Sequence, residues 1–187
     1  MEITASMVKT LREKTQAGMM DCKKALAEVD GDMDKAIDLL REKGLSKAAK
    51  KADRIAAEGL VKLVIADDMK SGAVVEVNSE TDFVAKNEEF IGFVEDLAKM
   101  VLETAPASIE ALKESKYMGT EETVQEVLSG KIAKIGENMN LRRSAREEAT
   151  GAVVGYVHGA GKIAVLVNFD SEAAAADLEE LGKDVAM

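Results

Sequence analysis

The stretch AVVEVNSETDFVAKNEEFIGFVEDLAKMVL, residues 73–102, decides the fold of this chain. It begins with a run of β-branched residues over 73–77, which is typical of a strand. It ends over 88–102 with apolar residues recurring every three or four positions, which predicts an amphipathic helix. The connection over 78–87 carries turn residues and ends at Asn87, a preferred N-cap. The stretch therefore predicts a sheet covered by a helix.

Phe83 stands beside Asp82 in the middle of that connection, in a chain with four Phe, two Tyr and no Trp. An aromatic ring next to a charge, on a loop between rigid elements, suits contact with another molecule. Burial of Phe83 at the end of the strand–helix layer is the other interpretation, and most Phe side chains are buried. The residue pattern alone favours burial and leaves both interpretations open.

The segments around this stretch extend the sheet. Residues 60–66 pair with 73–77 as an antiparallel hairpin, and 140–147 supply a third strand. A helix over 123–135 ends at Gly136. Further expected elements are a second hairpin, 150–157 with 162–169, and a C-terminal helix from 171 to 185.

The first 54 residues read as short helices separated by glycines. Apolar spacing predicts a helix after Thr4 or Ser6, a second from about 19 to 29, and a third that ends at Gly44. A fourth helical segment follows, with a basic stripe at one helical spacing: Lys47, Lys50, Lys51 and Arg54. We interpret this stripe as a solvated face, with RNA contact as the alternative. The fold class is α+β, a three-helix bundle followed by a core domain with an antiparallel sheet.

Composition bounds the function. A hydrophobic fraction of 47% with 32% charged residues describes a globular chain without the roughly 20 consecutive apolar residues that a membrane span needs. The single Cys22 indicates a reducing compartment, and we expect a cytoplasmic protein. The net charge is −10, and residues 55–187 hold 13 Lys and Arg against 25 Asp and Glu. We therefore expect no membrane partner and no direct contact with nucleic acid.

Catalytic patterns are not found. One histidine cannot form a multi-histidine metal site, and no nucleophile–base pair is indicated. The segment from Gly155 to Lys162 departs in spacing from a phosphate-binding loop, so a hairpin turn is the better interpretation. The sequence predicts a protein that is not an enzyme and that has no cofactor or metal site.

Several residues suit contact with a protein. Met19 and Met20 are neighbours at a helix start and point about 100° apart, so we expect one in the core and the other at least partly exposed. Burial of both is the alternative. His158 at a hairpin tip and Arg12 are each either a contact or an ordinary solvated residue.

Four motifs, in order, carry a resemblance to a known family. They are LREKTQAGMMDCKKAL at 11–26, EVNSETDFVA at 76–85, AKIGEN at 133–138 and YVHG at 156–159. With them the chain resembles the elongation factor Ts family over residues 2 to about 169. The resemblance implies an N-terminal bundle of the ubiquitin-associated type.

The resemblance implies a guanine nucleotide exchange factor of translation elongation, in protein biosynthesis. Its expected partner is elongation factor Tu, from which it promotes GDP release without chemistry or a cofactor of its own. Carried over from the family, Thr81, Asp82, Phe83 and Val84 would dislodge the partner's Mg²⁺. Arg12, Met19 and Met20 would grip the partner's GTPase domain, and Ile135, Gly136 and His158 would add contacts. The resemblance thus favours an exposed Phe83.

The chain departs from the family at three places. Gln16 replaces a more usual glycine, Val157 replaces a polar residue, and the chain stops at Met187, where many members continue. We expect a C-terminally shortened member, with a homodimer only if the missing part is present. The expected divisions are a bundle at 1–45, a linking helix at 46–58, a first core subdomain at 59–148 and an incomplete second one at 149–187. The competing function is a non-catalytic module that docks a protein or contacts RNA or the ribosome.

Overall fold

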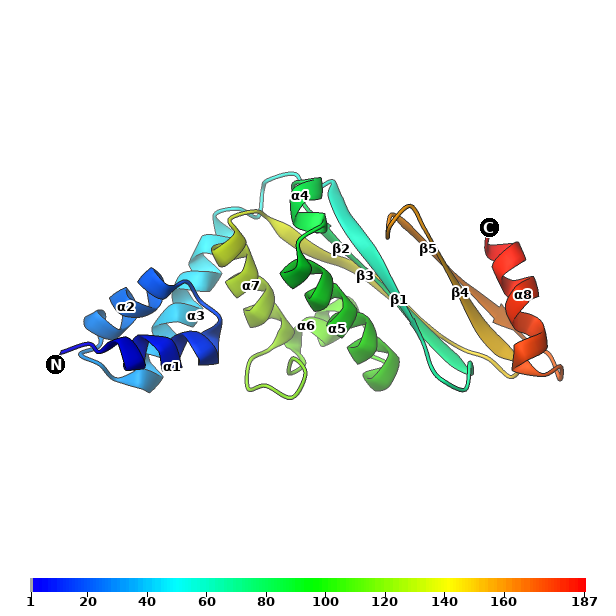
Figure 1. Cartoon of the computed structure of the whole chain (residues 1–187), viewed down its shortest axis with the longest axis horizontal. Coiled ribbons are helices and arrows are strands. Elements are labelled where there is room, and N and C mark those ends of the chain that lie inside the picture. The colour runs from blue at the N-terminus through cyan, green and yellow to red at the C-terminus, as the bar shows by residue number, and fades with distance from the viewer. Residues whose placement is uncertain (1) are drawn as a thin grey trace.

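The computed structural model describes residues 2–187 and is elongated, with its helical bundle at one end and its C-terminal helix at the other (Figure 1). Four layers follow one another between these ends: helices α5 to α7, a three-stranded sheet, a two-stranded sheet and helix α8. The helices are α1 Ala5–Thr15, α2 Met19–Glu28, α3 Met33–Ala49, α4 Asp82–Ala85, α5 Glu88–Thr104, α6 Ile109–Glu114, α7 Val124–Ile135 and α8 Ala175–Ala186. The strands are β1 Glu58–Ile65, β2 Ser71–Ser79, β3 Met139–Glu148, β4 Ala152–His158 and β5 Ile163–Phe169.

The central sheet has the order β1-β2-β3 and is antiparallel throughout. Alternate residues of β2 (Ala73, Val75 and Val77) are buried against α5, which contributes Phe90 and Phe93 to the same core. This alternation is what a period of two residues along a strand produces. The predicted α+β class is therefore confirmed.

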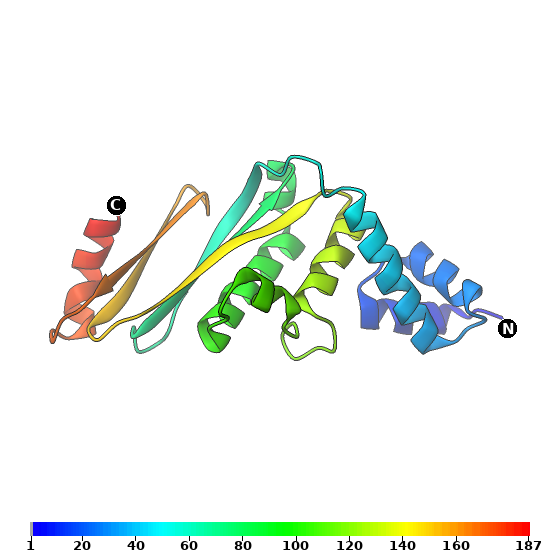
Figure 2. The ribbon, with the colours of Figure 1, turned by 180° about the vertical axis from the view of Figure 1, so that it is seen from behind.

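The opposite face of the sheet carries the β4–β5 hairpin, and α8 covers the far side of that hairpin (Figure 2). Two glycines allow these layers to approach closely. A Cβ atom on Gly155 would lie 2.4 Å from a Leu63 methyl group, and one on Gly182 would lie 2.5 Å from Cβ of Val154. Both distances are too short for a side chain, so these positions fix how closely the layers pack.

The N-terminal bundle has its own core, in which the fully buried side chains are Leu11, Cys22, Ala25, Leu26 and Ala36. The expected end of the third helix at Gly44 is wrong, because α3 continues to Ala49. Gly44 is buried where α3 crosses α7, with Gly130 3.8 Å from the position of a Cβ atom. Here glycine serves close helix packing and not a helix end, and this packing joins the bundle to the rest of the molecule.

Two short helices were not predicted. Helix α4 occupies the expected loop around Phe83, and α6 lies in the polar link before residue 123, capped by Ser108. The expected linking helix over 46–58 is wrong, because its first residues belong to α3 and residues 50–57 form turns and irregular backbone. The other predicted helices and both hairpins are confirmed, within one to four residues at their ends. Between residues 2 and 187, no helix has both the length and the apolar character that crossing a bilayer requires.

Candidate functional site

Phe83 belongs to helix α4, which follows the end of β2 and lies at the upper edge of Figure 1. The helix is a single turn whose N-cap, Thr81, accepts a hydrogen bond from the backbone N–H of Val84. Lys86 donates to Asp82 at 2.7 Å, and this hydrogen bond and the lysine charge hold the pKa of Asp82 below its ordinary value. Phe83 is 81% exposed, whereas Val84 is buried in the core beneath it. One turn therefore presents an aromatic ring and anchors it from below.

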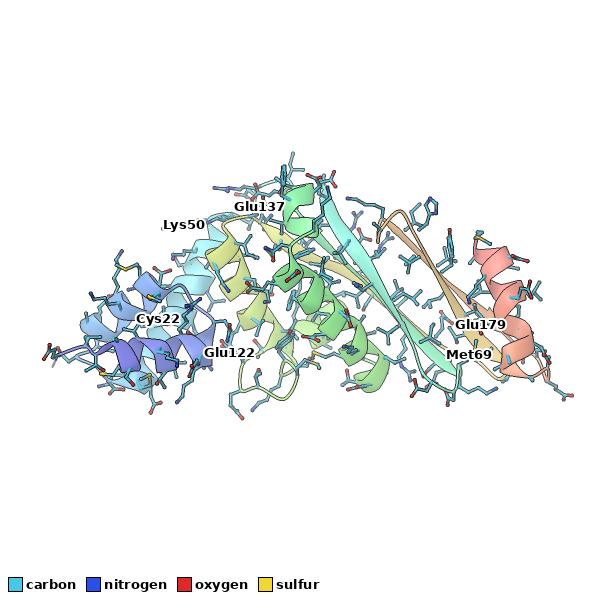
Figure 3. The ribbon with its side chains drawn as sticks, in the orientation of Figure 1. Cys22, Lys50, Met69, Glu122, Glu137 and Glu179 are labelled. Carbon is cyan, nitrogen blue, oxygen red and sulfur yellow. The ribbon has the colours of Figure 1, made fainter. Side chains whose placement is uncertain are left out.

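The Glu137 side chain and the Asn138 backbone, at the junction of α7 and β3, hold this turn. Glu137, labelled in Figure 3, accepts from Thr81 Oγ1 at 2.6 Å and from the Thr81 backbone N–H at 3.0 Å. Glu80 accepts from the backbone N–H of Asn138 at 2.6 Å. The sequence motif at 133–138 drew attention to this junction, but its bonds to residues more than fifty positions away could not be read from the sequence.

The same junction contains Ile135 and Gly136, which are half-buried. Gly136 ends α7 with a φ of 91°, a left-handed conformation that glycine adopts without strain. The two expected contact residues thus directly precede Glu137, the residue that holds Thr81.

His158 lies at the end of β4, exposed, with its Nδ1 3.0 Å from the hydroxyl of Tyr156. The turn after it reaches the start of β1, because the carbonyl of Gly161 accepts from the backbone N–H of Val61 at 2.7 Å. Lys162 pairs with Glu58 and also contributes to the lowered pKa of Asp82. Two separate parts of the predicted site, α4 and the β4–β5 turn, therefore lie on one edge of the molecule (Figure 1).

The two methionines at the start of α2 are both exposed, Met19 by 59% and Met20 by 61%. The expectation that one of them lies in the core was wrong. Three short helices enclose little volume, and Leu11, Cys22 and Leu26 already occupy it. Arg12 is exposed as well. Arg12, Met19 and Met20 belong to the bundle, at a distance along the molecule from α4.

The basic stripe does not form one continuous helical face, because α3 ends at Ala49. Lys47 pairs with Asp21 at 3.2 Å, and Arg54 lies 3.5 Å from Glu80. Two of its four cations therefore already have acidic partners within the chain, which weakens the case for an RNA contact.

A groove of about 590 Å³ lies beside the contact between α3 and α7, with Lys and Glu side chains on both walls. Burial raises the pKa of Glu122, which lines this groove, and the charge of Arg41 opposes that effect. Within residues 2–187, no three His, Cys, Asp or Glu side chains are grouped so that they could hold a metal ion.

Comparison with known proteins gives the family. The family model described as elongation factor TS matches residues 80–187, more than half of the chain. The chain belongs to the elongation factor Ts family.

Curated members of the elongation factor Ts family match almost the whole chain. The protein named elongation factor Ts from Clostridioides difficile strain 630 is 60% identical over 186 residues, which cover 99% of this chain and 61% of that protein. The proteins of that name from Clostridium perfringens strain SM101 and Clostridium botulinum strain Eklund 17B are 54% and 52% identical, with the same coverage. The chain spans about three fifths of the length of these relatives.

The family model matches only part of the candidate site, and the curated relatives match the rest. Helix α4, the α7–β3 junction and His158 fall inside the region matched by the family model. The bundle with Arg12, Met19 and Met20 lies before that region and is covered by the curated relatives.

Proposed function

We propose that this chain is a guanine nucleotide exchange factor that binds elongation factor Tu carrying GDP and speeds release of the GDP during translation in the cytoplasm. The chain acts by binding and performs no chemistry. The observation that carries the proposal is Phe83, which is 81% exposed on a turn fixed from several sides.

The way in which Phe83 is held supports a role in contact. An exposed ring gains little for the fold, because its apolar surface stays in water. The turn beneath it is nevertheless fixed by Val84 in the core and by the bonds of Thr81 to Glu137. A ring carried on a fixed backbone loses less conformational entropy on binding than one on a mobile loop, and such preorganised aromatic residues suit energetic hot spots.

The proposed mechanism is thermodynamic coupling. A factor that binds the nucleotide-free GTPase more tightly than the GDP-bound form weakens GDP binding by the same ratio. Tight GDP binding rests on Mg²⁺ and on backbone N–H groups around the phosphates. In the proposal, the segment from Thr81 to Val84 enters beside that site and displaces the groups that hold the ion. GTP then rebinds and releases the factor, so the equilibrium of the reaction is unchanged.

The remaining predicted residues supply affinity in this proposal. Met19 and Met20 offer flexible, exposed thioethers that adapt to a partner surface, and Arg12 offers an exposed charge on the same bundle. Ile135 and Gly136, which directly precede Glu137, and His158, at the end of β4, would extend the contact that α4 makes. In the proposed domain division, the bundle at 1–45 binds the partner and the core at 59–148 displaces the Mg²⁺.

The deciding experiment measures release of a fluorescent GDP analogue from elongation factor Tu, with and without this chain. We expect acceleration at micromolar concentrations of the chain. Phe83→Ala should reduce the acceleration by at least about thirtyfold, which corresponds to the loss of a hot spot of about 2 kcal/mol. Val185→Ala, which changes an exposed apolar residue on α8, is the matched control and should match the unmodified chain.

Failure of the unmodified chain to accelerate release contradicts the proposal. Binding without acceleration would support the docking module instead. Equal loss in the Phe83 and Val185 variants would show that Phe83 has no special place in the contact.

A further inference from the structure

Ile55 is 83% exposed, the highest value among the large apolar side chains that the structure describes as exposed. It lies between α3 and β1, in a connection from which regular secondary structure is absent over residues 55–57. A single exposed aliphatic residue on a flexible linker would need no explanation. The backbone around Ile55, however, is fixed.

Asn138 fixes the segment directly before Ile55. Its buried side-chain amide donates to the carbonyl of Ala52 at 3.3 Å and to the carbonyl of Arg54 at 2.8 Å. The chain before it is wound into successive turns, in which the N–H of Arg54 donates to the carbonyl of Lys51 at 2.9 Å. Three residues after Ile55, the carbonyl of Glu58 accepts from the side chain of Asn78 at 3.2 Å. Ile55 is thus exposed between two anchored points.

The anchors of Ile55 are also anchors of α4. Glu80, three residues before Phe83, accepts from the backbone N–H of Asn138 at 2.6 Å and lies 3.5 Å from the guanidinium of Arg54. Asn138 therefore connects the segment of Ile55 to the segment of Phe83. Both segments run along the same edge of the molecule (Figure 1). The connection between α3 and β1 passes beside α4 in both views (Figures 1 and 2).

We propose that Ile55 is a second apolar contact residue, which enters the same surface of the partner GTPase as Phe83. The inference rests on the proposed function, since the occupant of this surface is that partner. Two exposed apolar side chains on backbones joined by Asn138 are presented in a fixed mutual arrangement. Such an arrangement fits a partner surface with two adjacent apolar depressions, and it adds affinity without a further ordering cost.

The two residues have different roles. Phe83 sits on the turn beside Asp82, which the proposed function places at the partner's Mg²⁺ site. Ile55 lies on the neighbouring connection and carries no charged group that could act on the ion. Ile55 therefore contributes affinity, and Phe83 contributes both affinity and displacement.

The test is a titration of this chain against elongation factor Tu with bound fluorescent GDP, comparing the unmodified chain with Ile55→Ser. The concentration for half-maximal acceleration should rise about tenfold, and the maximal rate should stay within about twofold. Val185→Ser is the matched control, since Val185 is also an exposed aliphatic residue (62%) but lies on α8. The midpoint of thermal unfolding should be the same in all three proteins, because neither side chain is buried.

If Ile55→Ser and Val185→Ser give the same concentration for half-maximal acceleration, the inference about Ile55 is overturned. The proposed function still holds in that case, provided that the unmodified chain accelerates GDP release. Calorimetry, which measures binding directly, tests the case in which the exchange function fails but the contact role of Ile55 holds. If the unmodified chain binds without accelerating release and Ile55→Ser weakens that binding about tenfold, the exchange function fails and the contact role of Ile55 is supported.

Discussion

Phe83 and Phe90 are the same residue type only seven positions apart, yet Phe83 is 81% exposed and Phe90 is fully buried. Phe90 lies in the first turn of α5, where Asn87 accepts hydrogen bonds from the backbone N–H groups of Phe90 and Glu89. The apolar face of α5 then packs onto the sheet. Phe83 lies on α4, whose buried anchor is Val84.

The difference shows how the two regions are positioned. Helix α5 is placed by burial of a broad apolar face, which includes Phe90, Phe93 and Leu97. Helix α4 has four residues and is placed largely by hydrogen bonds, which Thr81 donates to Glu137 and the backbone N–H of Asn138 donates to Glu80. The first region stabilises the fold, and the second uses that stability to hold an exposed ring.

Replacement of each phenylalanine by alanine should give the largest contrast. Phe90→Ala empties a fully buried site and should lower the free energy of unfolding by about 3–5 kcal/mol. Phe83→Ala should change it by less than about 0.5 kcal/mol, since the ring is exposed. Chemical denaturation monitored by circular dichroism measures both values. Similar losses for the two variants would contradict the division between a region that stabilises the fold and a region that makes contact.

Changes at Glu137 test whether polar bonds position α4. Glu137→Ala removes two hydrogen bonds to Thr81 and should lower the free energy of unfolding by about 1–2 kcal/mol. It should also slow GDP release by more than the fraction of unfolded protein accounts for, because the turn that carries Phe83 is no longer held in place. Glu137→Gln keeps an acceptor for the Thr81 N–H and should recover most of the rate.

Release measured at a temperature well below the unfolding midpoint separates these effects. If Glu137→Ala loses stability but keeps the full rate, burial of Val84 alone positions the turn. If the Gln variant is as slow as the Ala variant, the carboxylate acts through its charge and not through its acceptor geometry.

The regions that burial determines were the ones that the sequence predicted well. The periodicity over 88–102 and the β-branched run over 73–77 predicted α5 and β2, because each pattern reports which residues face the core. Helix α4 was missed because a single turn is too short to show a helical period. The end of α3 was misplaced because Gly44 served packing against α7, a long-range contact.

The candidate site was predicted mainly through its family motifs. Residue type alone favoured burial of Phe83, and the structure exposes it. Ile55, Glu137 and Asn138 were not identified as site residues, since their role depends on hydrogen bonds between residues 56 to 84 positions apart. A local sequence pattern carries no information about such long-range contacts.

The smallest expected effect concerns two carboxylates, one in each region. Burial alone would raise the pKa of Glu89 in α5, but the hydrogen bond from Lys134 and the charge of Lys131 hold it below its ordinary value of 4.5. A lowered folded pKa means that ionised Glu89 stabilises the fold above about pH 4.5, and that this contribution is lost as the pH falls through the folded value. Glu89→Gln should therefore cost about 0.5–1 kcal/mol at pH 7, with the difference from the unmodified chain disappearing in acid.

Asp82 in α4 provides the counterpart to Glu89. Its pKa is also lowered, by the hydrogen bond and charge of Lys86, but this pair is exposed and solvent screens it. Asp82→Asn should thus leave the free energy of unfolding unchanged from pH 7 to acid while slowing GDP release. Denaturation curves of both variants between pH 3 and pH 7 measure the contrast. A pH-dependent loss of stability in Asp82→Asn equal to that in Glu89→Gln would show that α4 contributes to the fold in the same way as α5.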